Sequence, residues 1–406
     1  MSAVYVAGVG MTHFGVRLDT SVKQLTREAV DECLTDAGAA LSDVEAAYFG
    51  NTAQAVLEGQ VVITGEVALR SMGFESIPMI NVENACATAA TALHQAVMHV
   101  RAGMADIVLA VGTEKANSED KLKSLRLFEG GVDVHDRAGV ADILEQLGGP
   151  ITPGDRPRSM FMEIYAALAR AHMKEFGTTA EQLALVSSKN HGHAVDNPRA
   201  HFRTAMTVDE VLSARTIVDP LTTPMCAPLT DGAAAALVCS EAGLARLGGT
   251  ARAIKVLAVQ LGTGTPRELT DWSTSVSRRT ALRAYEQAGV GPDDVSVAEV
   301  HDAAAFGEIL QSELLGFCEP GGGGPLAASG ATTLGGRIPI NPSGGLESKG
   351  HPMGATGLGQ VFELVTQLRG EAGTRQVANA RIALAENGGG MFGGEEAVAS
   401  VTILGV

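Results

Sequence analysis

Aromatic side chains are scarce in this 406-residue chain, where they make up 4% of the residues while hydrophobic residues as a whole make up 45%. Small aliphatic side chains supply the difference, and 49 glycines accompany them. Such a composition predicts an interior in which helices and sheets approach one another closely. Because the chain is about two to three times as long as a common domain, we expect two core modules or one large duplicated unit.

Basic tracts, long apolar runs and cysteine pairs are also missing, and each absence excludes a class of protein. The net charge is −16, from 30 basic and 46 acidic residues, which argues against a nucleic-acid partner. No apolar run reaches the roughly 18 residues of a membrane span, and the glycine-containing N-terminus predicts a first strand rather than a signal peptide. We therefore expect a cytoplasmic protein. The cysteines include no C-x-x-C pair and predict neither disulfides nor a metal site: they are Cys33, Cys86, Cys226, Cys239 and Cys318.

Strand-like and helix-like segments alternate along the chain. Apolar runs at 3–10 and 106–114 predict strands, and the amphipathic pattern at 21–38 predicts a helix. Gly38 and Gly103 follow helical patterns, at places where a residue with positive φ would end a helix. The alternation predicts an α/β fold.

This α/β pattern recurs once. Ala-Gly followed by Asp-Val, at 37–44, returns with the same spacing at 288–295. The small-residue helix predicted for 86–103, which leads into a strand, is matched by 354–370, which leads into another strand. Two similar halves are the simplest interpretation, and a chance match of common helix endings is the alternative.

Residues 116–215 interrupt the rhythm with a Gly- and Pro-rich stretch, a long helical pattern and a polar segment. We interpret them as a lobe inserted over the active site, because long insertions in α/β enzymes commonly cover or select the substrate. The first half is then predicted to comprise 1–115 and 216–250, and the second half 251–406.

Cys86 lies between a predicted strand and a predicted helix, in the segment NVENACATAATALHQA. The positive end of the helix dipole and the free N–H groups at a helix start favour a thiolate, the form that a nucleophilic cysteine needs. The alternative is a buried structural cysteine, the state of most free cysteines.

Two histidines occupy positions from which they can act on a reacting group. His351 lies in SKGHPMGATG, where glycines and a proline predict an irregular loop before a helix. His301 follows an apolar strand, and loops at the carboxyl ends of strands carry functional residues in α/β folds. A capping or packing role is the alternative for each.

The glycine-rich segment ENGGGMFGG, at 386–394, follows the last run of predicted strand but precedes no helix. It therefore fails the context test for a dinucleotide-binding loop. Its glycines allow backbone N–H groups to approach a reacting oxygen closely. The alternative is a plain turn between two strands.

Taken in order, these motifs resemble those of the thiolase superfamily. NACATAATAL around Cys86 is followed by PLTDGAAAALV, EVHDAA with His301, SGGLESKGHPMGATG with His351 and LAENGGGMFGG. They span essentially the whole chain and are most similar to the sterol carrier protein-type and lipid-transfer-protein-like thiolases. The resemblance implies a duplicated thiolase fold, in which two α/β halves stack as five layers, α-β-α-β-α, with the two small-residue helices in the middle.

The resemblance also implies roles for single residues and an assembly. Cys86 would be the nucleophile that carries the acyl group, and His351 the base that takes its proton. His301, where other thiolases carry Asn, would form a first oxyanion hole with His351, and the backbone N–H groups of Cys86 and Gly388 would form a second. Coenzyme A would be the co-substrate, with no permanently bound cofactor. A homodimer is implied, together with a separate small zinc-ribbon and OB-fold partner.

Two positions depart from the thiolase pattern. Most thiolases carry, at one of them, a second cysteine that protonates the enolate carbon, but here they hold Glu386 and Ala303. Glu386 can take this role if burial raises the pKa of its carboxyl group, and the alternative is that it ends a strand and points to solvent.

The leading functional hypothesis is degradative cleavage of the C–C bond of a 3-oxoacyl-CoA with a bulky steroid, aromatic or branched acyl group. In the biosynthetic direction the same steps would form that bond. The alternatives are a decarboxylating condensing enzyme, a retro-aldolase of the same fold, and a non-enzymatic acyl-CoA-binding or lipid-carrier subunit.

Overall fold

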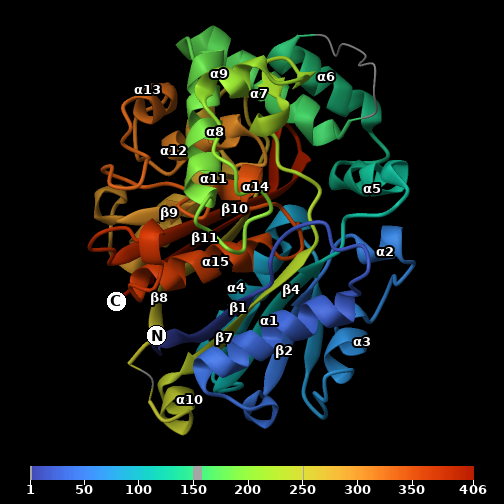
Figure 1. Ribbon diagram of the computed structural model, residues 1–406, viewed down its shortest axis with the longest axis vertical. Coiled ribbons are helices and arrows are strands. Elements are labelled where there is room, and N and C mark those ends of the chain that lie inside the picture. Colours follow the sequence, from blue (N-terminus) through green and yellow to red (C-terminus); the bar gives the residue numbers. More distant parts are fainter. Residues whose placement is uncertain (1, 150–157, 250) are drawn as a thin grey trace.

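The computed structural model describes residues 2–149, 158–249 and 251–406. Strands and helices alternate through its first part, as the sequence predicted (Figure 1). These elements are β1 (Val4–Met11), α1 (Val22–Ala37), β2 (Ala46–Gly50), α2 (Gln54–Leu57), α3 (Thr64–Arg70), β3 (Met79–Val82), α4 (Thr88–Arg101) and β4 (Ile107–Glu114).

Helices dominate the middle of the chain, and the alternation then returns. The middle elements are α5 (Lys121–Arg126), α6 (Arg137–Gly148), α7 (Met160–Phe176), α8 (Ala180–Ala194), α9 (Val208–Ser213), β5 (Thr216–Val218) and β6 (Leu221–Thr222). The last elements are β7 (Gly232–Ser240), α10 (Glu241–Arg246), β8 (Ile254–Thr263), α11 (Val276–Ala288), β9 (Val297–Glu299), α12 (Ala305–Leu314), α13 (Gly323–Ala328), α14 (Gly345–Ser348), α15 (Thr356–Leu368), β10 (Ile382–Phe392) and β11 (Glu395–Gly405).

The two helices of the recurring sequence pattern, α1 and α11, begin and end alike. Each begins after a serine whose hydroxyl accepts an N–H of the first turn: Ser21 for α1 and Ser275 for α11. Each ends at a left-handed glycine, Gly38 with φ 67° and Gly289 with φ 70°. Gly103 after α4 is also left-handed, with φ 69°, so the glycine helix ends predicted from the sequence are confirmed.

The larger sheet has nine strands in the order β3-β2-β4-β7-β1-β8-β11-β10-β9. A short antiparallel contact between β1 and β8 joins two half-sheets. In the first, β2 is parallel to β3 and β4; in the second, β9 is parallel to β10. A parallel bridge from Ala298 of β9 to Ile340 adds one more segment beside the second half-sheet. Both halves therefore place their successive segments in the same spatial order, which is the duplication that the sequence pattern indicated.

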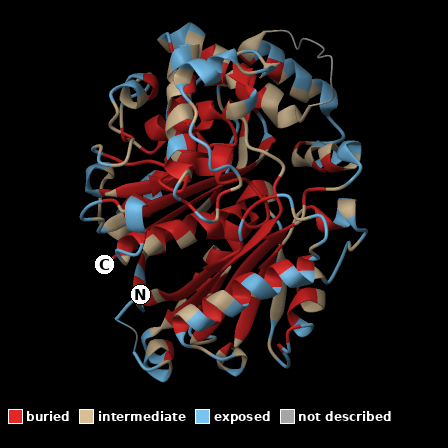
Figure 2. Cartoon of the chain, in the orientation of Figure 1, coloured by how far each residue is buried: buried red, intermediate tan, exposed pale blue. Residues whose placement is uncertain are grey.

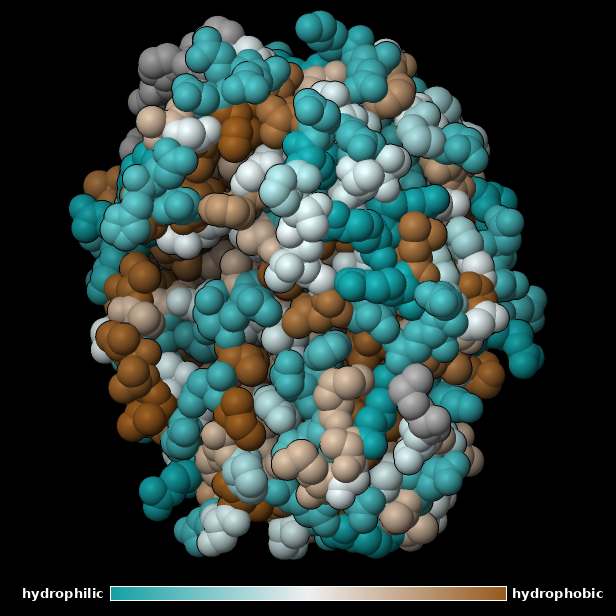
Figure 3. Space-filling model, turned by 180° about the vertical axis from the view of Figure 1, so that it is seen from behind, coloured by the Kyte–Doolittle hydropathy of each residue, from teal (hydrophilic) through white to brown (hydrophobic). Residues whose placement is uncertain are grey.

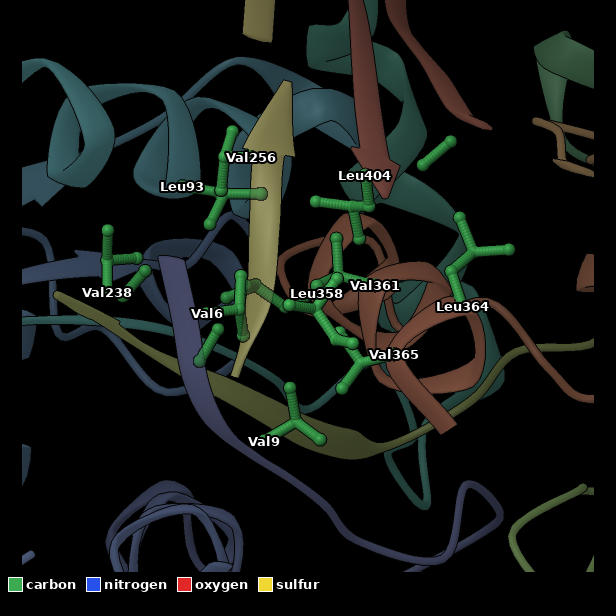
Figure 4. Close-up of a cluster of buried hydrophobic side chains, with 14 of the residues drawn as sticks. Val6, Val9, Leu93, Val238, Val256, Leu358, Val361, Leu364, Val365 and Leu404 are labelled. Carbon is green, nitrogen blue, oxygen red and sulfur yellow. The ribbon is translucent and has the colours of Figure 1, made fainter. Parts of the chain in front are cut away.

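Helices α4 and α15 pack against each other between the half-sheets (Figure 1). In α15, Gly357 comes so near to α4 that a Cβ atom would stand 2.6 Å from the backbone nitrogen of Ala90. α1 covers the outer face of the first half-sheet and α11 that of the second, which gives the expected five-layer stack. The strands and the two central helices are mostly buried (Figure 2). Both halves supply the aliphatic core (Figure 4), including Val6, Leu93, Val238, Val256, Leu358, Val361 and Leu404.

Helices α5 to α9 form a lobe beside the second half-sheet (Figure 1). α8 packs against α9, α12, α13 and α14, and a separate apolar cluster that includes Tyr165, Leu183, Trp272 and Phe306 fills this contact. Residues 150–157 of the Gly- and Pro-rich stretch lie outside the described residues. In the part of the chain that the structure describes, no helix has both the length and the apolar character that crossing a membrane requires.

Candidate active site

Cys86 lies in a single 3-10 turn, Ala85–Ala87, between β3 and the start of α4. The preceding residue, Ala85, has a left-handed backbone with φ 48°, which costs a non-glycine residue roughly 1–3 kcal/mol. Two neighbours hold it: the Glu83 carboxylate accepts the Ala85 N–H at 2.5 Å, and the Thr88 hydroxyl donates to the Ala85 carbonyl at 2.7 Å. This strained turn fixes the backbone that carries the Cys86 sulfur.

The surroundings of Cys86 oppose its ionisation. Burial, reinforced by the carboxylates of Glu396 and Glu114, raises the pKa of the Cys86 thiol to about 12, and the backbone N–H of Gly390 acts in the other direction. The expectation that the start of α4 would favour a thiolate is therefore wrong for the resting protein, because burial and the neighbouring carboxylates raise the pKa of the thiol. Cys86 is a thiol at neutral pH and needs a base when it attacks.

The hydrogen bonds of His351 suit it to act as that base. Its Nδ1 lies 2.7 Å from Thr356 Oγ1, and the Thr356 hydroxyl donates to the Pro352 carbonyl at 3.1 Å. Because this hydroxyl has one proton, Thr356 must accept the proton of Nδ1, which leaves the lone pair on Nε2 of His351. Nε2 has no hydrogen-bond partner among the described residues. Burial, and then His301 and Lys349, hold the pKa of His351 well below its ordinary value, so the ring is neutral and can accept a proton.

His301 lies just beyond β9, beside His351. Its backbone N–H donates to the Glu386 carboxylate at 3.0 Å, and its ring centroid lies 5.3 Å from that of His351. Neither of its ring nitrogens has a hydrogen-bond partner within the described chain, although Nδ1 lies 3.7 Å from the Glu396 carboxylate. The Cys86 sulfur and one ring nitrogen of each histidine all lie within 4.8 Å of one another. The structure thus brings together the three residues that the sequence analysis singled out.

These three side chains border a cavity of about 780 Å³. Seen from behind, the molecule has a recess on the side of α5 and α7, with hydrophobic residues inside it (Figure 3). The cavity wall is rich in aromatic residues for a chain that has so few, and three arginines also border it. The aromatic residues are Phe128, Phe161, Tyr165, Phe202 and the single tryptophan, Trp272, and the arginines are Arg158, Arg215 and Arg267.

Glu386 and Gly388, the other predicted site residues, are not among the described residues that border this cavity. Both belong to β10, in the interior of the second half-sheet. The Glu386 carboxyl group is completely buried, so the alternative that it points to solvent is excluded. Burial, and then the charge of Glu396, raises the pKa of Glu386 well above its ordinary value. From the glycine-rich segment it is Gly390, Met391 and Gly394 that border the cavity, and the backbone N–H of Gly390 lowers the pKa of the Cys86 thiol.

Sequence reasoning missed two carboxylates near the site, Glu114 and Glu396. Glu114, at the end of β4, accepts the backbone N–H of Gly354 at 3.0 Å and so ties the loop of His351 to the first half. Glu396, near the start of β11, borders the cavity. The available signal was a charged residue at the edge of an apolar strand pattern, which by itself does not distinguish a buried carboxylate from a solvated one.

Cys86, His301 and His351 also form the single group of His, Cys, Asp or Glu side chains, within the described ranges, whose spacing suits a metal ion. Sulfur and imidazole nitrogen are donors that Zn²⁺ prefers. A bound ion would occupy the lone pairs that the nucleophile and the base need.

Comparison with known proteins points to one family. Residues 4–242 match the family described as thiolase, N-terminal domain, and residues 261–405 match that described as thiolase C-terminal domain-like. Sterol carrier protein 2 of Bos taurus is 39% identical over 396 residues, 95% of this chain and 69% of that protein. Acetyl-CoA acetyltransferase of Methanothermobacter thermautotrophicus is 37% identical over 401 residues, 97% of this chain and 98% of that protein. Benzoylsuccinyl-CoA thiolase subunit BbsB of Thauera aromatica is 34% identical over 380 residues, 92% and 91% of the two chains.

Solved structures give the same picture. The Ltp2-ChsH2(DUF35) aldolase superimposes with a TM-score of 0.79 at 26% identity, over 100% of this chain and 98% of that one. Human mitochondrial 3-ketoacyl-CoA thiolase in complex with CoA superimposes with a TM-score of 0.72 at 18% identity, over 100% and 98% of the two chains. At 18% identity, the comparison with the human thiolase shows a shared fold and nothing more.

Proposed function

Because this chain belongs to the thiolase family and is an acyl-CoA acyltransferase, we propose that it cleaves or forms the C–C bond of a 3-oxoacyl-CoA through an acyl group carried on Cys86. One observation carries the proposal: the Cys86 sulfur and nitrogens of two buried histidines lie within 4.8 Å of one another at the wall of a mostly apolar cavity. A thiol, a base and donors for an oxyanion are the groups that acyl transfer through a thioester requires.

The proposed reaction moves the Cys86 proton to His351 and places negative charge on an enolate oxygen. Cys86 attacks the 3-keto carbon while Nε2 of His351 takes the thiol proton. The bond between C2 and C3 then breaks, its electron pair passes to the leaving thioester as an enolate, and the acyl group stays on sulfur. His301 and the protonated His351 donate hydrogen bonds to the enolate oxygen, where the negative charge develops. Free coenzyme A cleaves the acyl-enzyme, and condensation runs the same steps backwards.

We infer that the acyl group is bulky, with an aromatic or steroid-like ring system as the best fit. The volume of about 780 Å³ lies in the upper part of the range of roughly 300–1,000 Å³ common for ligand pockets. Phe128, Phe161 and Trp272 surround this one cavity although aromatic residues make up only 4% of the chain. Arg158 and Arg215 border the same cavity and supply positive charge for the coenzyme A phosphates in a chain whose net charge is −16.

Intact-mass analysis after incubation with a panel of acyl-CoAs and 3-oxoacyl-CoAs tests the proposal. We expect an added acyl mass that maps to Cys86. The fraction of protein that carries it should be larger with ring-containing acyl groups than with acetyl. An unmodified protein with every substrate, or an adduct on another cysteine, would contradict the acyl-enzyme. Release of the adduct by free coenzyme A, as a new acyl-CoA, completes the assignment.

Retro-aldol cleavage is the second candidate, favoured by the likeness to the Ltp2-ChsH2(DUF35) aldolase. That reaction also breaks a C–C bond and stabilises an enolate, but it forms no thioester with the protein. Retention of Cys86 next to His301 and His351 supports the thiolase reaction. C–C cleavage of a 3-hydroxyacyl-CoA, unaffected by Cys86→Ser, would establish the retro-aldolase instead.

We also propose that two copies pair along β3, the end strand of the first half-sheet. An edge strand presents N–H and C=O groups that a second strand can pair with. Residues 61–63 next to it are apolar and each more than half exposed, and Thr64 beside them bonds to Asn81 of β3. Hydrophobic residues are visible on this side of the molecule in Figure 3. Sedimentation should give a dimer that Val62→Asp weakens, and a fully active wild-type monomer would contradict it.

A second, smaller partner and a cytoplasmic location are kept as predictions. The relative BbsB is named a subunit, and the similar aldolase is named with a DUF35 component, which supports a partner for this chain too. Co-expression with a zinc-ribbon and OB-fold protein encoded nearby, followed by gel filtration, tests whether the two copurify in a fixed ratio.

A further inference from the structure

We propose that Glu396 is the residue that exchanges a proton with the α-carbon of the acyl-CoA, in place of the second cysteine of other thiolases. This inference rests on the proposed function, since it assigns one step of that reaction. The groups already described account for attack on the carbonyl and for the oxyanion, but they leave the carbon of the enolate without a proton donor.

Glu396 borders the cavity beside the reactive residues. It is the second residue of β11, and 22% of its side-chain surface is exposed, with the cavity next to it. Its Oε1 lies 3.7 Å from Nδ1 of His301. Glu396 also lies close enough to act on Cys86: after burial, the charge of an ionised Glu396 is the largest contribution that raises the pKa of that thiol. Glu396 therefore lies within reach of the same reacting centre as the nucleophile.

The hydrogen bonds of Glu396 come from neutral groups. Ser277 Oγ donates to Oε2, and Gln311 Nε2 donates to Oε1 at 3.4 Å. Among the described residues it forms no ion pair with Lys or Arg. A guanidinium partner would hold a carboxylate ionised, whereas hydroxyl and amide donors fix its position and still allow it to gain and lose a proton.

The neighbouring Glu395 shows the opposite arrangement. Its Oε2 lies 3.1 Å from Arg267 Nε, and its two oxygens accept the backbone N–H groups of Thr265 and Val276 at 2.9 and 2.7 Å. Glu395 also borders the cavity, but an arginine and two backbone N–H groups hold its carboxyl oxygens. Its position, one residue away on the same strand, makes it a matched control for Glu396.

The glycine-rich segment of β10 leaves the room that Glu396 occupies. A Cβ atom on Gly388 would stand 1.9 Å from Glu396 Oε1, so a side chain there must displace the carboxyl group. The carboxylate of Glu386, two residues earlier, accepts the backbone N–H of His301, and Glu386 does not border the cavity. The proton carrier that the sequence placed at Glu386 is therefore better placed at Glu396.

The proposed step balances over one turnover. In cleavage, His351 takes the Cys86 proton, and Glu396, as a carboxylic acid, gives its proton to C2 of the enolate. Before the second half-reaction the proton on His351 passes to the Glu396 carboxylate. The neutral His351 then takes the proton of the coenzyme A thiol as its sulfur attacks the acyl group. His351 returns its proton to the departing Cys86 sulfur. Both carriers end in their starting states, and no other acid or base is consumed.

The test separates acylation from proton exchange. The full-length protein is incubated with acetyl-CoA in D₂O; intact mass reports the acyl group on Cys86, and mass spectrometry of recovered acetyl-CoA reports deuterium at C2. In Glu396→Gln we expect exchange and C–C cleavage to fall by roughly 10²-fold or more, the usual size of a lost acid–base group. Acylation should stay within a few-fold of wild type.

Control variants show whether the effect belongs to Glu396. Glu395→Gln should leave the ratio of exchange to acylation as in wild type. Gly388→Ala keeps the Glu396 carboxyl group but displaces it, so exchange should fall more than acylation does. Tyr165→Phe and Cys226→Ser alter two further cavity groups that can carry a proton, and both should exchange faster than Glu396→Gln.

Three results would overturn the proposal: unchanged exchange in Glu396→Gln, equal loss of exchange and acylation in that variant, or selective loss of exchange in Tyr165→Phe or Cys226→Ser. A wild-type protein that forms no acyl-enzyme at all would overturn the proposed function instead. The two failures are therefore distinguishable in the same experiment.

Discussion

The two halves of the molecule share a strand order but differ where their strands end. Ile-x-Leu-Ala occurs at 107–110 in β4 and at 382–385 in β10, and β2 pairs with the first as β9 pairs with the second. In this register Gly50 of the first half occupies the position that His301 has in the second. A Cβ atom on Gly50 would stand 2.7 Å from the Thr88 side chain, so the first half is packed solid at the point where the second borders the cavity.

This difference shows that the duplication accounts for the shared scaffold of the two halves. The reactive site depends on residues that differ between them. The central helices begin next to unlike residues: Cys86 precedes α4, and His351 precedes α15. Since α4 and α15 pack together, the nucleophile from one half meets the base from the other. Neither half holds both groups, so removing a reactive group from one half tests what the other half can still do.

Removing the nucleophile of the first half should have the largest effect. Cys86→Ser should abolish both acylation and thiolysis, because a serine hydroxyl is close in size but far less acidic and less nucleophilic than a thiol. Intact mass should show no acyl adduct, and the melting temperature should stay within a few degrees of wild type. Residual thiolysis at wild-type rate would remove Cys86 from the mechanism.

Removing the histidines of the second half should have the next largest effect. His351→Ala and His301→Ala should each lower kcat by roughly 10²-fold or more, the cost of an oxyanion donor worth about 3 kcal/mol. His351→Ala should also slow acylation by a simple acyl-CoA, whereas His301→Ala should act mainly on C–C cleavage. The double variant should lose less than the product of the single effects, because both rings serve one enolate. Independent, multiplicative losses would show that they act at different steps.

A pH effect on stability should follow from Glu347, on α14 of the second half. Burial, and then the charge of Glu308, raises the pKa of Glu347 to about 8. The folded protein then keeps a proton that the unfolded chain releases near its ordinary pKa of 4.5. This contribution to the unfolding free energy is complete below pH ~4.5 and is lost as pH rises towards ~8, on the order of a few kcal/mol.

Denaturant unfolding at pH 5 and pH 8 measures this contribution. Glu347→Gln stays neutral at both values, so its unfolding free energy should fall less between them than that of the wild type does. An equal fall in both proteins would mean that Glu347 is already ionised in the fold.

The smallest effect is expected at the cavity mouth. Arg215 is exposed and borders the cavity, so Arg215→Ala should raise KM for an acyl-CoA by about 2- to 5-fold with little change in kcat, as for an exposed ion pair worth at most about 1 kcal/mol. The difference should shrink at high salt. Arg381→Ala, exposed but away from the cavity lining, serves as the control, and an equal rise in KM there would show a general effect of charge.

Local patterns identified much of this molecule. Strand and helix periodicities, with glycines such as Gly38 and Gly289 at helix ends, predicted the α/β alternation and its repetition. Cys86, His301 and His351 stood out because each follows a strand or precedes a helix within an unusual run of small residues. Their nearness could be expected only through the family resemblance, since they lie far apart in the chain.

Properties that depend on distant neighbours escaped the sequence analysis. The state of Cys86 was predicted wrongly, because the charges of Glu114 and Glu396 reach it only after β4 and β11 have taken their places around α4. The glycine-rich segment that begins at Glu386 was predicted to follow the last strand, but β10 runs through it to Phe392, and Glu386 is buried within that strand. Which face of the strand borders the cavity depends on the pairing of β10 with β11 and on the lobe above them.

The sequence by itself determined the elements, their repetition and the kinds of reactive group, because backbone preferences and side-chain chemistry are local properties. Only the tertiary structure decided which nitrogen of His351 is free, that Gly390 rather than Gly388 borders the cavity, and that Glu396 lies beside His301. The physical reason is that hydrogen-bond partners, desolvation and charge–charge distances are set by contacts between segments far apart in the chain. Such contacts change pKa values and open or close a cavity while leaving no mark on the local pattern of residues.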